Sequence, residues 1–175
     1  MAIDAYGLQD IKKELQHLSS PRLAELVLCL ARYKKENKEL LAYLLFLAGD
    51  EEAFIQQAKY EIGMMFYSMP SQPFNAVKVL RKILRYITKL SRFSGSKGVE
   101  ITLLISFCTN YLEYTYTKVN YKPLRTILIR QVEKVGKLIS KLHEDLQFDY
   151  MTDYTQLLDA ADAKLSWFNK MEFEI

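Results

Sequence analysis

The fold of this chain is decided by residues 74–93, which run FNAVKVLRKILRYITKLSRF. Apolar side chains recur in this stretch at alternating steps of four and three residues, which is the period of one face of an α-helix. The members of this apolar stripe are Ala76, Leu80, Ile83, Ile87 and Leu90. Such a stripe predicts a long helix that buries one face against other helices.

Similar helical patterns fill the rest of the chain, and turn signals separate them. Ser20-Pro21 is typical of a helix start, Gly49-Asp50 of a helix end followed by a new start, and residues 94–98 of a short loop. The chain of 175 residues contains only six Gly and four Pro, and no stretch alternates with period two for long enough to indicate a strand. We therefore expect a single all-α domain, residues 1–175, of about eight antiparallel helices.

Two parts of the chain are similar in the spacing of their large apolar residues. Four such residues in the first part match four in the second part at a constant offset of 57 residues. The first four are Leu23, Leu26, Val27 and Leu30, and the second four are Leu80, Ile83, Leu84 and Ile87. After a two-residue insertion, Leu44-Leu45-Phe46 also matches Leu103-Leu104-Ile105. Over residues 20–108 the chain resembles HEAT and armadillo helical-hairpin repeats, and the resemblance implies stacked pairs of antiparallel helices. An irregular helical bundle has the same kind of spacing and stays open as the alternative.

The basic residues of the stretch 74–93 form a second stripe, shifted by two positions from the apolar one. Its members are Lys78, Lys82, Arg85, Lys89 and Arg92. Two positions correspond to about 200° around a helix, so we expect this stripe to lie opposite the core face. Too few acidic residues lie one helical turn away to neutralise it.

Another basic stripe follows in the helix expected near residues 123–146. Its outer face carries Arg130, Lys134, Lys137 and Lys141. Only Glu133 interrupts this stripe, and Lys97 adds a further charge in the loop before a helix start, where free backbone N–H groups attract anions. A row of positive charge along a helix suits the phosphates of DNA or RNA, or an acidic protein. The two stripes and Lys97 together form our candidate polyanion-binding site.

Acidic residues gather near the C-terminal end of the chain. Residues 78–141 carry 14 Lys/Arg and three Asp/Glu, a net charge of +11. Residues 142–175 carry two Lys/Arg and eight Asp/Glu, a net charge of −6. The acidic segment can either lie across the basic stripes and neutralise them, or leave them open for a ligand. Both arrangements are compatible with the sequence.

Three classes of function are compatible with these features. The leading hypothesis is a non-enzymatic interaction module that binds a protein partner. The alternative is a nucleic-acid-binding protein that uses the basic stripes at residues 78–92 and 130–141. An enzyme is the third hypothesis, and no catalytic constellation supports it. His17 and His143 lack further ligands at metal-binding spacing, so we expect no catalytic residue, no metal site and no cofactor.

Cysteine usage bears on where the protein resides. Cys29 and Cys108 each lie in an apolar helical stretch, and we expect two buried thiols in a reducing cytoplasm. The start of the chain lacks a signal-peptide pattern, and the longest strongly apolar run, residues 40–48, is far too short to span a membrane. We therefore expect a cytoplasmic protein with no membrane partner.

Overall fold

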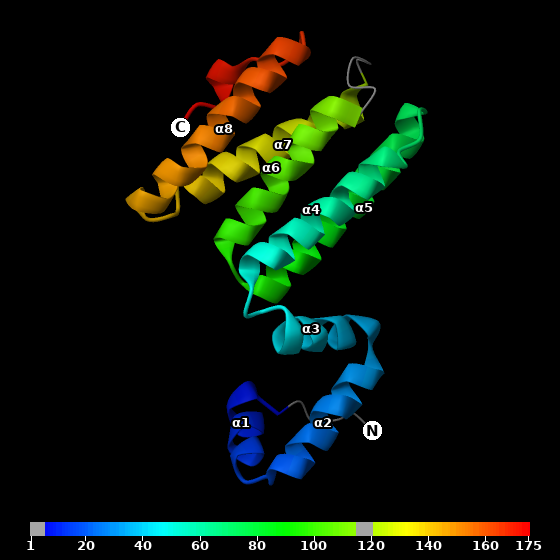
Figure 1. Ribbon diagram of the computed structural model, residues 1–175, viewed down its shortest axis with the longest axis vertical. Helices are drawn as coiled ribbons and strands as arrows, with labels where there is room; N and C mark the ends of the chain where they lie inside the picture. Colours follow the sequence, from blue (N-terminus) through cyan, green and yellow to red (C-terminus); the bar gives the residue numbers. More distant parts are fainter. Residues whose placement is uncertain (1–5, 115–120) are drawn as a thin grey trace. The chain divides into compact units, whose positions relative to one another are not determined.

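The computed structural model describes residues 6–114 and 121–175, which form eight α-helices and one short 3-10 helix (Figure 1). The helices are α1 (Leu8–Gln16), α2 (Ser20–Tyr33), α3 (Lys35–Phe46), α4 (Glu51–Tyr67), α5 (Pro73–Ser94), α6 (Lys97–Tyr114), α7 (Lys122–Ile139), α8 (Glu144–Lys164) and η1 (Lys170–Glu172). No strand is present in these two ranges. The predicted all-α fold of about eight helices is confirmed.

The helices separate into two compact units, residues 1–47 and residues 48–175. The smaller unit contains α1, α2 and α3, and the larger unit contains α4 to α8 together with η1. The single domain expected over residues 1–175 stays a prediction.

The residues at the two ends of α5 determine its length. Pro73 occupies the first turn, where its missing backbone N–H leaves no hydrogen bond unmade. Gly95 follows the last turn with a φ of 65°, a left-handed conformation that favours glycine, and its N–H donates to the carbonyl of Ser91 at 3.0 Å. All five members of the predicted apolar stripe between these ends are buried. The helix expected over residues 74–93 is thus present, one residue longer at each end.

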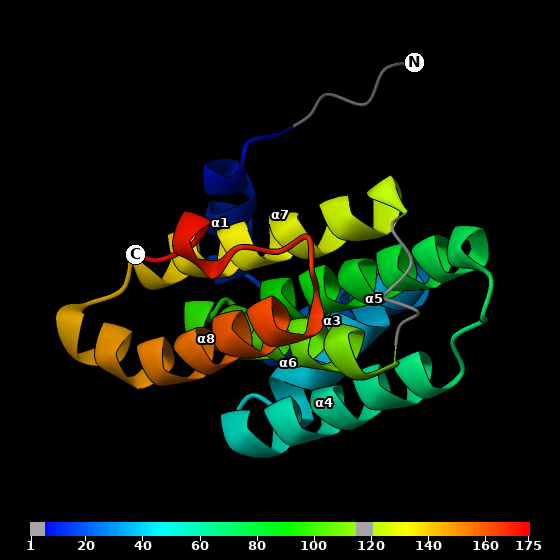
Figure 2. The same cartoon turned by 90° about the horizontal axis from the view of Figure 1, so that it is seen from above.

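The helices of the larger unit form two layers. α4, α6 and α8 lie in one layer, and α5 and α7 lie in the other (Figure 2). α6 packs on α4, α5, α7 and α8. On α6 the ring centroid of Phe107 lies 5.4 Å from that of Phe66 on α4, and both side chains are buried. The core of this unit is therefore built around α6.

α7 and α8 approach each other closely where Gly136 faces Tyr154. The Tyr154 hydroxyl lies 3.3 Å from the Val132 carbonyl oxygen and 3.0 Å from that of Phe173. It thereby ties α8 to α7 and to the C-terminal segment. A Cβ atom on residue 136 would lie 2.9 Å from this hydroxyl. The missing side chain of Gly136 makes room for the tyrosine.

α2 and α3 of the smaller unit form a hairpin with a thin core. The amide of Asn37 donates to the carbonyl of Leu30 at 2.8 Å, which satisfies an acceptor near the end of α2. No side chain of α1 or α2 is buried, and α3 buries only Tyr43. The expectation of two buried thiols is right for Cys108 and wrong for Cys29, which is exposed. A helical apolar pattern predicts which residues share a face. Those residues are buried only where another element covers that face.

Candidate polyanion-binding face

The first basic stripe lies on the outer face of α5, opposite the buried stripe. Four of its predicted members are exposed, and Lys89 is half-buried. Arg81 is exposed on the same face, because it lies three residues after Lys78 and four before Arg85. We call the six residues the α5 basic face: Lys78, Arg81, Lys82, Arg85, Lys89 and Arg92. The predicted stripe left out Arg81 because it starts from Lys78 with a step of four to Lys82, whereas Arg81 is reached by a step of three followed by a step of four to Arg85.

Among the described residues, five of the six cations of the α5 basic face have no neighbouring carboxylate. α5 itself contains no Asp or Glu. Within the described ranges, five of its six cations have no carboxylate oxygen within 4.0 Å, namely Lys78, Arg81, Lys82, Arg85 and Arg92. Because unpaired surface cations create a positive potential, this face attracts anions.

A shallow hollow of about 470 Å³ lies on the α5 basic face, lined by Lys78, Arg81, Leu84 and Arg85. Leu84 is half-buried and gives the hollow an apolar component. Next to it, the Lys78 Nζ atom lies 4.5 Å from the ring centroid of Phe74, which is 64% exposed. Cations beside an exposed aromatic ring suit a phosphate backbone with an unpaired base.

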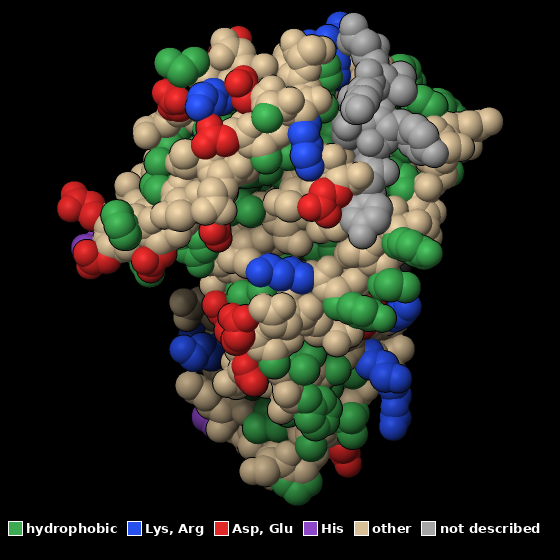
Figure 3. Space-filling model, turned by 45° about the horizontal axis from the view of Figure 1, so that its top comes forward, with side chains coloured by type: hydrophobic (Ala, Val, Ile, Leu, Met, Phe, Trp, Pro, Cys, Tyr) green, Lys and Arg blue, Asp and Glu red, His purple; other side chains and the backbone are tan. Residues whose placement is uncertain are grey.

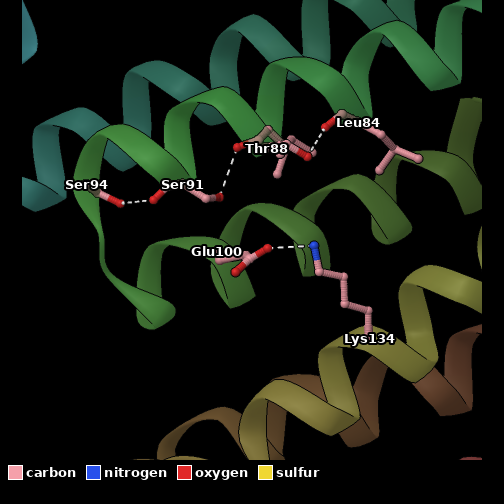
Figure 4. Close-up of polar contacts among 7 residues, drawn as sticks. Leu84, Thr88, Ser91, Ser94, Glu100 and Lys134 are labelled. Carbon is pink, nitrogen blue, oxygen red and sulfur yellow. Dashed lines mark hydrogen bonds and ion pairs between the residues drawn. The ribbon is translucent and has the colours of Figure 1, made fainter. Parts of the chain in front are cut away.

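The basic stripe on α7 is less open than the one on α5. Arg130, Lys137 and Lys141 are exposed, but Lys134 is half-buried. The Lys134 Nζ atom lies 2.6 Å from a carboxylate oxygen of Glu100 on α6 (Figure 4). The charge of Lys134 is therefore balanced inside the fold. Glu133, exposed on the same helix, lowers the net charge further.

The loop of residues 94–98 uses its polar groups internally. The Ser96 hydroxyl accepts the backbone N–H of Val99 at 3.3 Å, and the Ser94 hydroxyl accepts the N–H of Ser96 at 3.2 Å. Lys97 is exposed. Because a serine already caps the first turn of α6, the loop contributes the charge of Lys97 rather than a free set of N–H donors.

The acidic C-terminal segment lies away from the α5 basic face. α8 packs on α6 and α7, and both ribbon views place α6 and α7 between α8 and α5 (Figures 1 and 2). Acidic side chains project around the start of α8, next to a histidine (Figure 3). Asp159 pairs at 2.7 Å with Lys170, within the segment itself, and this contact raises the pKa of Lys170. Of the two arrangements compatible with the sequence, the fold therefore has the one in which α8 leaves the α5 basic face open.

A polar groove over α6 was not expected from the sequence. It has a volume of about 480 Å³ and runs between α4 and α8. Its charged lining consists of Lys59, Glu113, Asp153 and Lys164. Two positive and two negative side chains give the groove no net preference for an anion or a cation. Its residues come from three helices, so no local pattern in the sequence points to it.

The ionisable groups in the core are held in their neutral forms. Burial raises the pKa of the Cys108 thiol and of the Tyr111 hydroxyl. Burial also raises the pKa of Tyr154 to about 12. A thiol whose pKa is raised by an apolar environment is a poor nucleophile. Cys108 is therefore part of the packing of α6.

Within residues 6–114 and 121–175, no three or more His, Cys, Asp and Glu side chains are grouped so that they could hold a metal ion. None of the helices in the same ranges combines the length and apolar character of a membrane span.

No protein-family model, no curated protein and no solved structure matches this chain.

Proposed function

We propose that this chain is a non-enzymatic interaction module that binds nucleic acid through the α5 basic face. The observation that carries the proposal is a row of five exposed cations on a helix that contains no acidic residue, and none of the five has a carboxylate partner in the described part of the chain. Such a row is a favourable surface for a phosphate backbone.

The dimensions of the α5 basic face support this assignment. Lys78 and Arg92 are 14 positions apart, which corresponds to about 21 Å along a helix at about 1.5 Å per residue. Cations recur about every 5 Å along this length, so several phosphates of one strand can be contacted at once. Phe74, exposed beside Lys78, offers a ring for stacking on an unpaired base and favours a single strand over an acidic protein.

Charge reversal on α5 tests the proposal. We expect the double variant Lys82→Glu with Arg85→Glu to weaken binding of a labelled single-stranded oligonucleotide by on the order of 100-fold, because two contacts become two repulsions. Fluorescence anisotropy at low salt measures the affinity. The matched control is Lys137→Glu with Lys141→Glu on α7, which makes the same charge change at two exposed lysines. An equal loss in both double variants, or no binding by the unmodified protein at low salt, contradicts the assignment to α5.

A protein-binding module is the second candidate function, and the exposed apolar side chains of α2 and α3 favour it. Leu30 and Leu44 are 62% and 57% exposed, respectively. Exposed apolar surface of this kind is typical of an interaction site.

The helical-hairpin repeat and the cytoplasmic location are further proposals. The contacts of α2 with α3 and of α5 with α6 support the repeat, since each pair consists of consecutive helices joined by a short loop. Two free cysteines, Cys29 and Cys108, support a reducing compartment. Labelling of the protein in cells, followed by fractionation, tests the location: recovery in a cytoplasmic fraction supports it, and recovery in an oxidising compartment contradicts it.

A further inference from the structure

The polar groove over α6 is formed by three helices that run in the same direction. α4, α6 and α8 all begin at the lower end of the larger unit in Figure 1 and end at its upper end. α6 supplies the floor of the groove, α4 contributes Lys59 to one wall, and α8 forms the other wall. On the floor, Thr102 and Glu113 are 11 positions apart, which corresponds to about 16 Å along a helix at about 1.5 Å per residue. The groove is therefore long enough for several residues of a ligand chain.

The register of α8 against α6 places its two charged groove residues at opposite ends of this floor. A Cβ atom on residue 98 of α6 would lie 2.6 Å from the Tyr150 hydroxyl of α8. Asp153 comes three positions after Tyr150, so it lies near the level of residue 101 on the parallel helix α6. Lys164 comes 14 positions after Tyr150 and lies near the level of residue 112, beside Glu113. The far end of the groove thus carries one cation and one carboxylate.

The near end of the groove has the same combination of charges. The stacked pair of Phe66 on α4 and Phe107 on α6, with ring centroids 5.4 Å apart, sets the register of these two helices. Lys59 comes seven positions before Phe66, so it lies near the level of residue 100 on α6. Lys59 and Asp153 therefore face the groove from opposite walls at this end.

The polar groups of the groove are available to a ligand. Within the described ranges, none of its four charged side chains has an oppositely charged atom within 4.0 Å. The side-chain amide of Asn110 donates to the carbonyl of Ser106 at 2.8 Å, and its own oxygen accepts no hydrogen bond from the described residues. The amide of Gln156 on the α8 wall has no hydrogen-bond partner among them. Ser106 and Ala160 are small, so a peptide main chain can approach these amides closely.

We propose that the polar groove binds an extended peptide that carries an acidic and a basic side chain about five positions apart. An extended main chain presents free N–H and C=O groups, which amides such as Asn110 and Gln156 can both accept from and donate to. At about 3.3 Å per residue, about five residues span the 16 Å floor. An acidic side chain at one end of the peptide then meets a groove lysine, and a basic side chain at the other end meets a groove carboxylate.

The charges of the groove favour this ligand over two others. A nucleic acid has no positive groups, so its phosphates would be repelled by Asp153 and Glu113. An apolar helix laid in the groove would cover four charges without pairing them, which is unfavourable. A peptide with charges of both signs pairs with the groove residues and leaves fewer of them unsatisfied.

Selection from a phage-displayed library of random octapeptides against the full chain tests the proposal. We expect the enriched sequences to pair one acidic with one basic residue about four or five positions apart. A labelled copy of an enriched peptide then gives the affinity by fluorescence anisotropy. The matched control is Lys82→Glu with Arg85→Glu on α5, a helix that contributes no residue to the groove. This control should bind the peptide as tightly as the unmodified protein does.

Two pairs of charge reversals change the groove in opposite senses. Lys59→Glu with Lys164→Glu removes both lysines, so new selections should no longer require an acidic residue. Asp153→Lys with Glu113→Lys removes both carboxylates, so new selections should no longer require a basic residue. Each double variant should bind the original peptide on the order of 10-fold more weakly, because attractive contacts become repulsive. Asp153 and Glu113 are both exposed, so their double variant carries the test if the lysine variant loses helix content by circular dichroism.

Three outcomes overturn the proposal. The first is a library selection without any enriched sequence. The second is enrichment of acidic residues alone, which the α5 basic face would select, or of apolar residues alone. The third is an enriched peptide that binds both groove variants as tightly as the unmodified protein. The groove lies in the layer of α4, α6 and α8, whereas the α5 basic face lies in the other layer (Figure 2). Peptide binding and nucleic-acid binding can therefore fail separately.

Discussion

Replacing Gly136 with alanine should destabilise the protein, although alanine is the better helix former. In the middle of a helix this exchange normally gains about 1 kcal/mol. The added Cβ would lie 2.9 Å from the Tyr154 hydroxyl and 3.5 Å from a methyl carbon of Ile175. Tyr154 is 1% exposed, so it cannot swing into solvent. It has to shift by about half an ångström, which strains the packing between α7 and α8.

The expected size of the effect follows from these contacts. Overpacking a core costs about 1–3 kcal/mol, and the hydrogen bond that Tyr154 makes with the Phe173 carbonyl is worth about 1 kcal/mol. Subtracting the helix gain leaves a net loss of about 1–3 kcal/mol in the free energy of unfolding. The matched control is Gly63→Ala in α4, because a Cβ there meets nothing within 4 Å. That variant should gain up to about 1 kcal/mol.

Urea denaturation followed by circular dichroism measures both variants. A second comparison isolates the hydroxyl: in a Tyr154→Phe background, Gly136→Ala should become much less harmful, because the atom at 2.9 Å has been removed. If Gly136→Ala stabilises the protein as much as Gly63→Ala, the close approach of α7 and α8 at this position is wrong. If the loss is the same with Tyr and with Phe at position 154, the hydroxyl is not its cause.

Three further predictions concern a helix cap, the thiols and alkaline pH. Asp50→Ala should cost about 1 kcal/mol in thermal or urea unfolding, because the Asp50 carboxylate accepts the N–H of Ala53 at 2.9 Å at the start of α4; an unchanged stability contradicts this. A thiol reagent should modify Cys29 rapidly and Cys108 only after unfolding; rapid modification of two thiols in the native protein would show that Cys108 is accessible. The pKa of Tyr154 is raised from 10.0 to about 12 in the folded state, so its contribution to stability is complete below pH 10 and is lost as the pH rises toward 12. Urea midpoints of Tyr154→Phe should therefore fall less steeply over this pH range than those of the unmodified protein, and parallel declines would count against the assignment.

The sequence predicts the helices of this fold well where apolar residues recur with the helical period and turn residues mark the helix ends. The apolar stripe of residues 76–90 is buried throughout, and Gly49-Asp50 marks the start of α4 with the Asp50 cap in place. The last helix ends at Lys164, although Phe168, four residues farther along the chain, is still buried. Periodicity records which side chains face the core, and a turn can hold Phe168 there as well as a helix can.

The sequence likewise predicts one part of the candidate site and not the rest. The position of the α5 basic face follows from a count of residues around one helix, so the sequence predicts it. The pairing of Lys134 with Glu100 joins two helices and has no local signal, so the sequence could not show that the α7 stripe is partly neutralised. The position of α8 away from α5 is likewise a matter of how the layers stack (Figure 2). The exposure of Cys29 was missed because no pattern within α2 reveals which element covers it.

The salt dependence of oligonucleotide binding tests the proposed polyanion-binding face most directly. Five exposed cations should give a slope of about −3 to −4 for the logarithm of the association constant against the logarithm of salt concentration on a single strand. In Lys82→Glu with Arg85→Glu the slope should flatten by about 1.4, because two phosphate contacts are removed. In Lys137→Glu with Lys141→Glu it should stay close to that of the unmodified protein. Equal slopes in the unmodified protein and the α5 double variant would contradict the account.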